Sequence, residues 1–196
     1  MSTPDQTEAT VASAARPMRA DARRNRERVL AAATAAFAEH GSDAQMDDVA
    51  RAAGVGVGTV YRHFPTKEAL VAELVRRRFE TFVAHAREAL AEPDPWEAFA
   101  GLVRRNAELM ARDAAVREAI ARTPGSLTAA AREREELLGL ARRLVAHAQR
   151  AGSLREDFSA DDLPMIMCGL SSTMSARSGF DWRRHLELIL DGLRAR

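Results

Sequence analysis

The sequence predicts an all-α protein of about nine helices, and three observations support that prediction. Apolar residues recur at helical spacing along most of the chain, whereas the alternation typical of strands occurs nowhere. Proline and glycine interrupt this pattern where helices would be joined, as in residues 92–95 and 123–126. The 196 residues are enough for one large or two small helical domains with a core.

The first helix is expected over residues 20–40, where Val29, Leu30 and Phe37 share one face and Gly41 follows the last turn. Two short helices come next, and a long helix then carries Arg76-Arg77-Arg78, which we expect to be exposed. The helices expected after the first cover residues 46–53, 58–64, 66–90, a segment from 96, 113–121, a segment ending near 150, 160–176 and 181–196.

Residues 46–64 have the pattern of two short helices joined by a tight turn. The first buries one face that includes Val49 and Ala50, and Gly54 supplies the positive backbone angle of the turn. The second helix buries Val60 and Phe64 and leaves four side chains outward, namely Thr59, Tyr61, Arg62 and His63. This is the form of a helix-turn-helix that reads DNA.

The motif lies in a longer stretch that resembles the TetR-type transcriptional regulators. The matching residues are Arg28-Val29-Leu30, Ala32-Ala33, Phe37, Gly41, Val49-Ala50, Ala53-Gly54-Val55, Gly58 to Phe64 and Lys67 to Leu70. The resemblance implies a homodimer that binds a palindromic operator through an N-terminal three-helix domain. It also implies a C-terminal helical domain for ligand binding and dimerisation.

Two positions depart from the family pattern. Many members have serine where Gly56 stands, and serine or threonine where Gln45 stands at the start of the helix over 46–53. Each departure removes a helix cap worth about 1 kcal/mol. We expect Asp43, Asp47 or Asp48 to supply part of the missing capping.

Charge is concentrated near the N-terminus, although the net charge of the whole chain is only +1. The segment from residue 16 to residue 28 contains six arginines and two acidic residues, which gives it a net charge of +4. Such a run suits phosphate contacts beside a recognition helix, and its alternative is a solvated charge run on a disordered tail. We therefore expect a disordered basic arm over residues 1–19, the helix-turn-helix domain over 20–66 and the helical domain over 67–196.

The expected DNA contacts come from the arm and the second short helix. Arg62 is expected to reach a guanine, and Lys67 to pair with a phosphate. Tyr61 and His63 suit phosphate or thymine-methyl contacts. The full set is Arg24, Arg28, Gln45, Val57, Gly58, Thr59, Tyr61, Arg62, His63 and Lys67.

The last two helices are amphipathic, and in proteins of the TetR type the corresponding helices form the interface between two subunits. A dimer would double the contacts that one short recognition helix makes on a palindrome. The alternative is that these helices only close the core of one chain. The expected interface residues are Leu163, Ile166, Met167, Leu170, Met174, Trp182, Leu186, Ile189 and Leu193.

The central helices combine apolar side chains with a few polar ones, and the resemblance implies a pocket there for a small apolar or amphipathic effector. Ordinary core packing is the alternative. The expected lining is Trp96, Phe99, Leu102, Asn106, Met110, Leu137, Leu140 and Leu144.

Several classes of function are excluded by what the sequence lacks. It has no Walker loop, no HExxH motif and no serine elbow, so we do not expect an enzyme. No two histidines have the spacing of a helical metal site, and no cofactor or metal is expected. A single cysteine, Cys168, and the lack of a long apolar run fit a cytoplasmic protein.

The predicted function is a ligand-responsive transcriptional regulator. The simplest form is a homodimeric repressor that binds palindromic operator DNA and is released by a small molecule. The alternative is a dimeric ligand-binding or protein-interaction module whose DNA-binding part is weak or inactive, because Gln45 and Gly56 depart from the family pattern.

Overall fold

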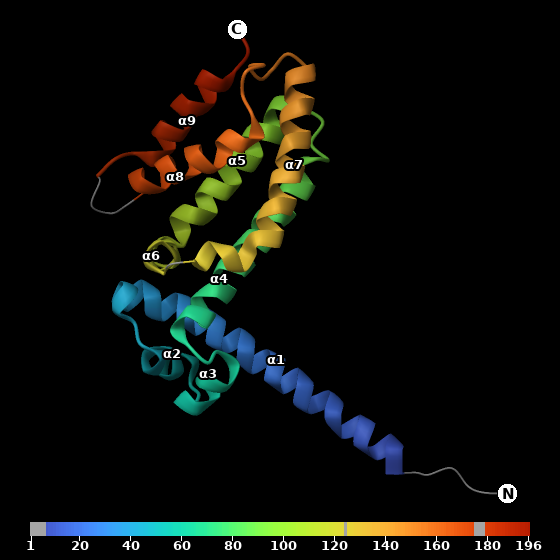
Figure 1. Ribbon diagram of the computed structural model, residues 1–196, viewed down its shortest axis with the longest axis vertical. Helices are drawn as coiled ribbons and strands as arrows, with labels where there is room; N and C mark the ends of the chain where they lie inside the picture. Colours follow the sequence, from blue (N-terminus) through green and yellow to red (C-terminus); the bar gives the residue numbers. More distant parts are fainter. Residues whose placement is uncertain (1–6, 124, 175–178) are drawn as a thin grey trace, which may run out of the picture. The chain divides into compact units, whose positions relative to one another are not determined.

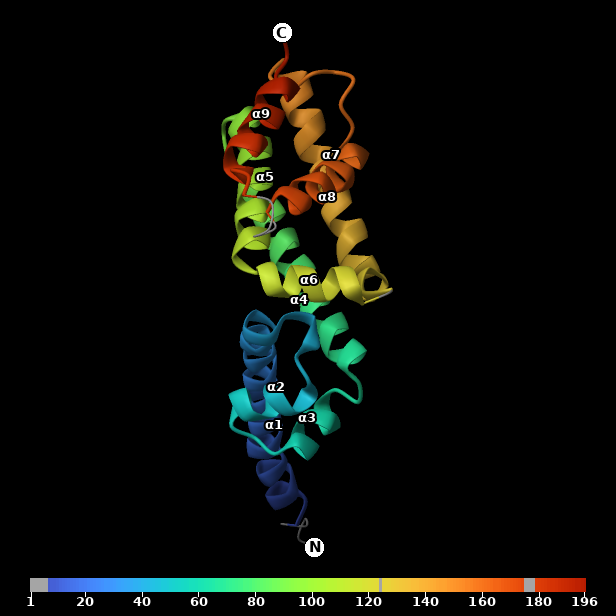
Figure 2. The same cartoon turned by 90° about the vertical axis from the view of Figure 1, so that its left-hand side faces the viewer.

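The computed structural model describes residues 7–123, 125–174 and 179–196 (Figures 1 and 2). Within these ranges the chain is helical, and its one β feature is an isolated bridge between Leu154 and Arg194. The α-helices are α1 Thr7–His40, α2 Met46–Ala53, α3 Val57–His63, α4 Lys67–Ala89, α5 Pro95–Arg112, α6 Ala114–Arg122, α7 Ala131–Arg150, α8 Leu163–Thr173 and α9 Trp182–Leu193. Short 3-10 helices cover Gly41–Asp43, Ser126–Ala130 and Ala160–Asp162. The prediction of an all-α fold is confirmed.

Contacts divide the chain into an N-terminal unit, Met1–Leu70, and a C-terminal unit, Val71–Arg196. The expected boundary, after residue 66, lies four residues earlier. The first turn of α4 belongs to the N-terminal unit because Leu70 is fully buried and the Nζ of Lys67 lies 5.8 Å from the centre of the Phe37 ring. The helix α4 therefore continues from one unit into the other.

The start of α1 differs from the expectation, since the helix begins at Thr7 rather than near residue 20. Residues 7–19 of the expected disordered arm are thus helical, and residues 1–6 lie outside the described residues. Alanine supplies five of the residues between 7 and 20, and it has the highest helix propensity. The prediction of a disordered arm rests on the polar residues of this stretch, whereas its alanine content favours a helix.

The core of the N-terminal unit forms where α1 packs on α2 and α3. The expected apolar faces are confirmed, because their members are all buried: Val29, Leu30, Ala33, Phe37, Met46, Val49, Ala50, Ala53, Val60 and Phe64. Small Ala50 and Ala53 let α2 approach its neighbours closely. The packed side chains of this core hold α3 in a fixed position.

The C-terminal unit has two clusters of buried side chains. The larger joins α5 and α7 to α8 and α9, around Phe99, whose ring centre lies 5.6 Å from that of Phe158 in an edge-to-face arrangement. The smaller joins α4, α5 and α7 through three alanines, Leu102 and Leu144. Figure 1 shows α8 and α9 beside α5. The α5 helix begins as Asp94 and Pro95 predict, since the Asp94 carboxylate accepts the Glu97 N–H at 2.9 Å.

Replacing Phe37 by alanine tests the core of the N-terminal unit. Phe37→Ala should lower the free energy of unfolding by about 3–5 kcal/mol, because the ring is fully buried and leaves a cavity. Urea titration followed by far-UV circular dichroism measures this. Glu39→Ala, on the exposed side of the same helix, should change the value by less than about 0.5 kcal/mol. Equal losses in the two variants would contradict this account of the core.

Candidate nucleic-acid and ligand sites

The turn between α2 and α3 depends on one glycine in the left-handed conformation. Gly54 has φ 63° and ψ 39°, a region that disfavours residues with a Cβ. Its N–H donates to the carbonyls of Ala50 and Arg51, and the N–H of Val55 donates to Ala50 at 3.1 Å. These bonds end α2 and reverse the chain toward α3, as the sequence predicts.

Arg28 reinforces this turn from α1. Its Nη2 donates to the carbonyl of Ala53 at 2.7 Å, so a cation caps the negative end of α2. The guanidinium lies 3.5 Å from the position that a Cβ on Gly54 would occupy. Arg28 was expected to contact DNA, whereas here its guanidinium fixes the turn that positions α3.

The N-terminus of α2 is capped despite the unusual Gln45. The Asp48 carboxylate accepts the N–H of Gln45 at 2.9 Å, and this bond lowers the pKa of Asp48. The expected compensation by a nearby aspartate is therefore present. The Gln45 amide is exposed and donates to the carbonyl of Asp43 at 2.7 Å. By contrast, Gly56 precedes α3 without any side-chain cap.

One face of α3 is open to solvent. Val57, Gly58, Tyr61 and Arg62 are exposed, with Tyr61 at 48%, while Val60 between them is fully buried. Thr59 and His63 were expected to point outward, but both are half-buried because they flank the buried Val60 face. Arg62 makes no hydrogen bond or ion pair with the described residues, which leaves its guanidinium available to a ligand.

The other basic residues expected at DNA have partners within the N-terminal unit. Arg24 is exposed and forms an ion pair with Asp21. Lys67 is half-buried over the Phe37 ring, and Thr66 caps α4 by accepting the Ala69 N–H at 3.1 Å. Arg26, which the sequence reading did not single out, lies 5.2 Å from the centre of the Phe64 ring. The arginine-rich segment of α1 therefore packs against the helix-turn-helix and also carries positive charge.

The expected interface residues of α8 and α9 mostly belong to the chain's own core. Leu170 and Leu186 are buried in the larger cluster, so they are not available to a partner. Six others pack against that cluster while half-buried, namely Leu163, Ile166, Met167, Met174, Trp182 and Leu193. Ile189 is half-buried apart from the cluster. Each helix carries two apolar faces, and the more continuous face turned inward.

The opposite faces of these helices hold the apolar side chains that remain in solvent. Met165 on α8 is 70% exposed, Phe180 just before α9 is 70% exposed, and Leu188 on α9 is 57% exposed. Cys168 lies on the same exposed side of α8. The predicted interface residues do not include these side chains, although the three-residue spacing of Met165 and Cys168 is visible in the sequence.

The expected pocket residues divide between the two clusters of buried side chains. Trp96 and Phe99 belong to the larger cluster, whereas Leu102, Leu137, Leu140 and Leu144 belong to the smaller one. The buried amide of Asn106 contacts the Nδ1 of His85 at 2.8 Å, and Met110 is half-buried. Two open surface depressions are lined mainly by polar side chains such as Glu88 and Arg104, and include none of the expected residues. Alanines 86, 89 and 98 bring α4, α5 and α7 close together in the smaller cluster.

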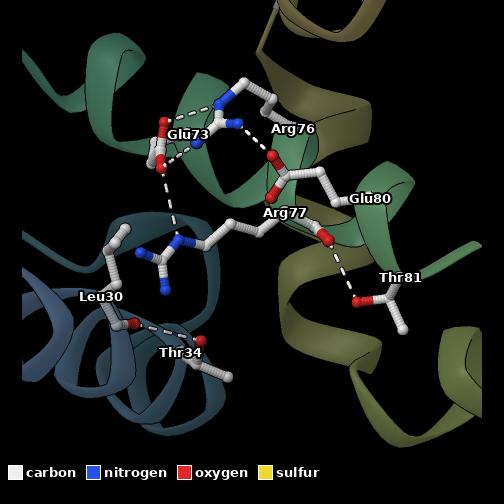
Figure 3. A network of polar contacts seen from close by, with 7 residues as sticks. All are labelled: Leu30, Thr34, Glu73, Arg76, Arg77, Glu80 and Thr81. Carbon is white, nitrogen blue, oxygen red and sulfur yellow. Dashed lines mark hydrogen bonds and ion pairs between the residues drawn. The ribbon is translucent and has the colours of Figure 1, made fainter. Parts of the chain in front are cut away.

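The arginine run of α4 is where the sequence reading was most clearly wrong. Arg76 and Arg77 are half-buried and share the carboxylate of Glu73, and Arg76 also pairs with Glu80 (Figure 3). Arg78 was expected to be exposed but is buried, with 8% of its surface accessible. Consecutive helical residues point about 100° apart, and Arg78 lies on the face of α4 that carries the buried Leu74 and Phe82. The four-residue spacing of Leu74, Arg78 and Phe82 was the available signal.

Known proteins match the chain over nearly its whole length. A family model described as bacterial regulatory proteins of the tetR family matches residues 29–74. A second, described as the C-terminal domain of SbtR-like transcriptional regulators, matches residues 94–195. An HTH-type transcriptional regulator of Staphylococcus aureus is 36% identical over 72 residues, which are 36% of this chain and 39% of that protein. The match to this curated relative therefore spans well under half of its length.

Solved structures extend the match. A TetR regulatory protein from Mycobacterium vanbaalenii is 38% identical, with a TM-score of 0.67 over 91% of this chain and 100% of that one. A TetR regulator from Streptomyces coelicolor is 30% identical, with a TM-score of 0.64 over 87% and 98%. FadR from Bacillus subtilis, solved with stearoyl-CoA, shares the fold at 18% identity and a TM-score of 0.67 over 84% and 95%.

The helix-turn-helix described above lies within the first of these matched regions, and the helical C-terminal unit contains the second. None of the helices within the described residues is long and apolar enough to cross a membrane. This chain belongs to the TetR family of bacterial transcriptional regulators, and its N-terminal unit carries the family's DNA-binding helix-turn-helix.

Proposed function

We propose that this regulator is a homodimeric repressor that binds a palindromic operator through α3 and leaves it when a small apolar or amphipathic molecule binds the C-terminal unit. The observation that carries the DNA-binding part is the exposed face of α3, with Tyr61 and the unpaired Arg62 held on a rigid turn. An arginine of this kind donates two hydrogen bonds to O6 and N7 of a guanine in the major groove.

A dimer is supported by the small size of the reading element. The seven residues of α3 reach too few base pairs for selectivity in a genome, and two-fold symmetry doubles that number. The apolar side chains exposed on and beside α8 and α9, namely Met165, Phe180 and Leu188, supply a surface that a second copy would cover. The interface proposed here therefore uses the opposite side of these helices from the one predicted from the sequence.

Ligand control is supported by the continuity of α4. This helix begins against Phe37 in the N-terminal unit and continues into the C-terminal unit, so a ligand that shifts it acts on both. Release from DNA requires the ligand to bind the non-binding arrangement more tightly than the DNA-binding one. The same fold accommodates stearoyl-CoA in FadR, which supports an amphipathic molecule as the effector.

Arg62 and Lys67 should have separable effects on DNA binding. Arg62→Ala should weaken the selected operator by about 1–3 kcal/mol and relax the preference at one base position. Lys67→Ala should weaken all sequences alike and lower the slope of log affinity against log salt by about one. Fluorescence anisotropy on operators selected from fragments of the source genome measures both. Equal losses with unchanged preference in the two variants would refute the assigned roles.

Charge placed on α8 and α9 should break the dimer. Met165→Glu combined with Leu188→Glu should give monomers, because two carboxylates per subunit would be desolvated in the interface. Sedimentation velocity at micromolar concentration measures the state. Leu127→Glu is the matched control, since Leu127 is an exposed leucine that lies outside α8 and α9. A dimer that persists in the double variant would place the interface elsewhere.

A further inference from the structure

The most unusual charged group of the C-terminal unit is the buried guanidinium of Arg78. Only 6% of its side chain is accessible. Its Nη2 donates to the carbonyl of Asp113 at 3.1 Å and lies 3.5 Å from that residue's Oδ2, while its Nε has no hydrogen-bond partner. A buried N–H without an acceptor costs free energy, and more so on a cation.

Two other arginines of the same unit show how a carboxylate fills this edge of a guanidinium. Arg104 donates from Nε and Nη2 to the two oxygens of Glu187 at 2.8 and 2.9 Å. Arg183 does the same with Glu108 at 2.9 and 3.1 Å. The Nε and Nη2 donors of a guanidinium match the spacing of a carboxylate. On Arg78 only Nη2 of these two donors has an acceptor among the described residues, and Nε has none.

A second arginine increases the positive charge at this place. Arg117 on α6 donates from Nη1 to the carbonyl of Met110 at 2.8 Å and from Nη2 to that of Met174 at 3.2 Å. Burial lowers the pKa of both arginines, and the charge of Arg117 lowers that of Arg78 further. The carboxylates that oppose them are Asp113, which is one-third exposed, and Glu118, which is exposed. Among the described residues, Asp113 is the carboxylate that pairs with Arg78.

The surroundings are apolar on both sides. Leu74 and Phe82, one turn before and after Arg78 on α4, are buried, and Val116 next to Arg117 is also buried. Two turns along α4, His85 contacts the amide of Asn106 at 2.8 Å, which adds a second polar group between α4 and α5. The half-buried methionines 110 and 174 have flexible side chains that can repack around an added molecule.

We propose that Arg78 and Arg117 bind the carboxylate of an amphipathic organic acid, whose apolar part packs beside α4, α5 and α6. This rests on the proposed function, because the acid would be the effector that acts through α4. The open Nε of Arg78 and its Nη2 would receive the two carboxylate oxygens, and Arg117 would supply the second charge. A monoanion is favoured over a dianion since the Asp113 carboxylate already lies beside Arg78.

Calorimetry with the full-length protein and a series of straight-chain acids, octanoate, decanoate and laurate, tests the site, with methyl decanoate and 1-decanol as uncharged analogues. We expect saturable binding of at least one acid, at least about tenfold tighter than its uncharged analogue. Arg78→Met should lower the affinity for the acid by about tenfold or more, and Arg117→Met should lower this affinity less. Arg104→Met, which removes an arginine already saturated by Glu187, should leave acid binding unchanged.

Several results would overturn the proposal: no saturable binding of any acid, equal binding of acid and ester, or equal losses in Arg78→Met and Arg104→Met. If Arg78→Met does not fold, Arg78→Lys is measured instead. Lysine keeps the charge but lacks the paired donors, so the affinity for the acid should fall by the same factor. DNA binding is read separately by anisotropy. Acid binding without any specific DNA binding would refute the proposed function and leave the carboxylate site intact. Acid binding that leaves operator affinity unchanged would refute the effector role.

Discussion

The presentation of α3 depends on the left-handed backbone of Gly54. The turn ends α2, reverses the chain within a few residues and places Val60 in the core, so that Tyr61 and Arg62 must face solvent. Arg28 adds a hydrogen bond to the carbonyl of Ala53, which ties this turn to α1. A side chain with a Cβ at position 54 would be strained and would also approach the Arg28 guanidinium. DNA reading therefore rests on a backbone conformation more than on any polar contact.

The C-terminal unit combines close helix packing with buried charge. Alanines bring α4, α5 and α7 together, which leaves little room for a preformed apolar cavity among them. Arg78, in contrast, is buried with a guanidinium Nε that lacks a hydrogen-bond partner among the described residues, and the half-buried Arg117 bonds the carbonyls of Met110 and Met174. Buried polar groups without partners are rare in native proteins and usually have a ligand or a functional role. The C-terminal unit therefore combines a closely packed apolar core with a buried guanidinium that has a donor left to offer.

The prediction from sequence was good where local chemistry decides the structure. The helix-turn-helix, the glycine turn and the compensation of Gln45 by Asp48 follow from backbone rules that act within a few residues. The exposed face of α3 was predicted in part, since Thr59 and His63 proved half-buried. The burial of Arg78, Leu170 and Leu186 and the hydrogen bond of Arg28 to Ala53 were not predicted, because each depends on what a distant helix places beside the residue.

The fold class, the helix-turn-helix and the family can be inferred from the sequence alone, because hydrophobic periodicity, a glycine turn and a dense motif are local properties of the chain. Packing between helices sets which of the two apolar faces on α8 and α9 is buried and which of the three arginines on α4 turns inward. Periodicity tells that a helix has an apolar face, but packing against other helices chooses among several candidate faces. That choice is a property of the whole unit and is not contained in any one segment.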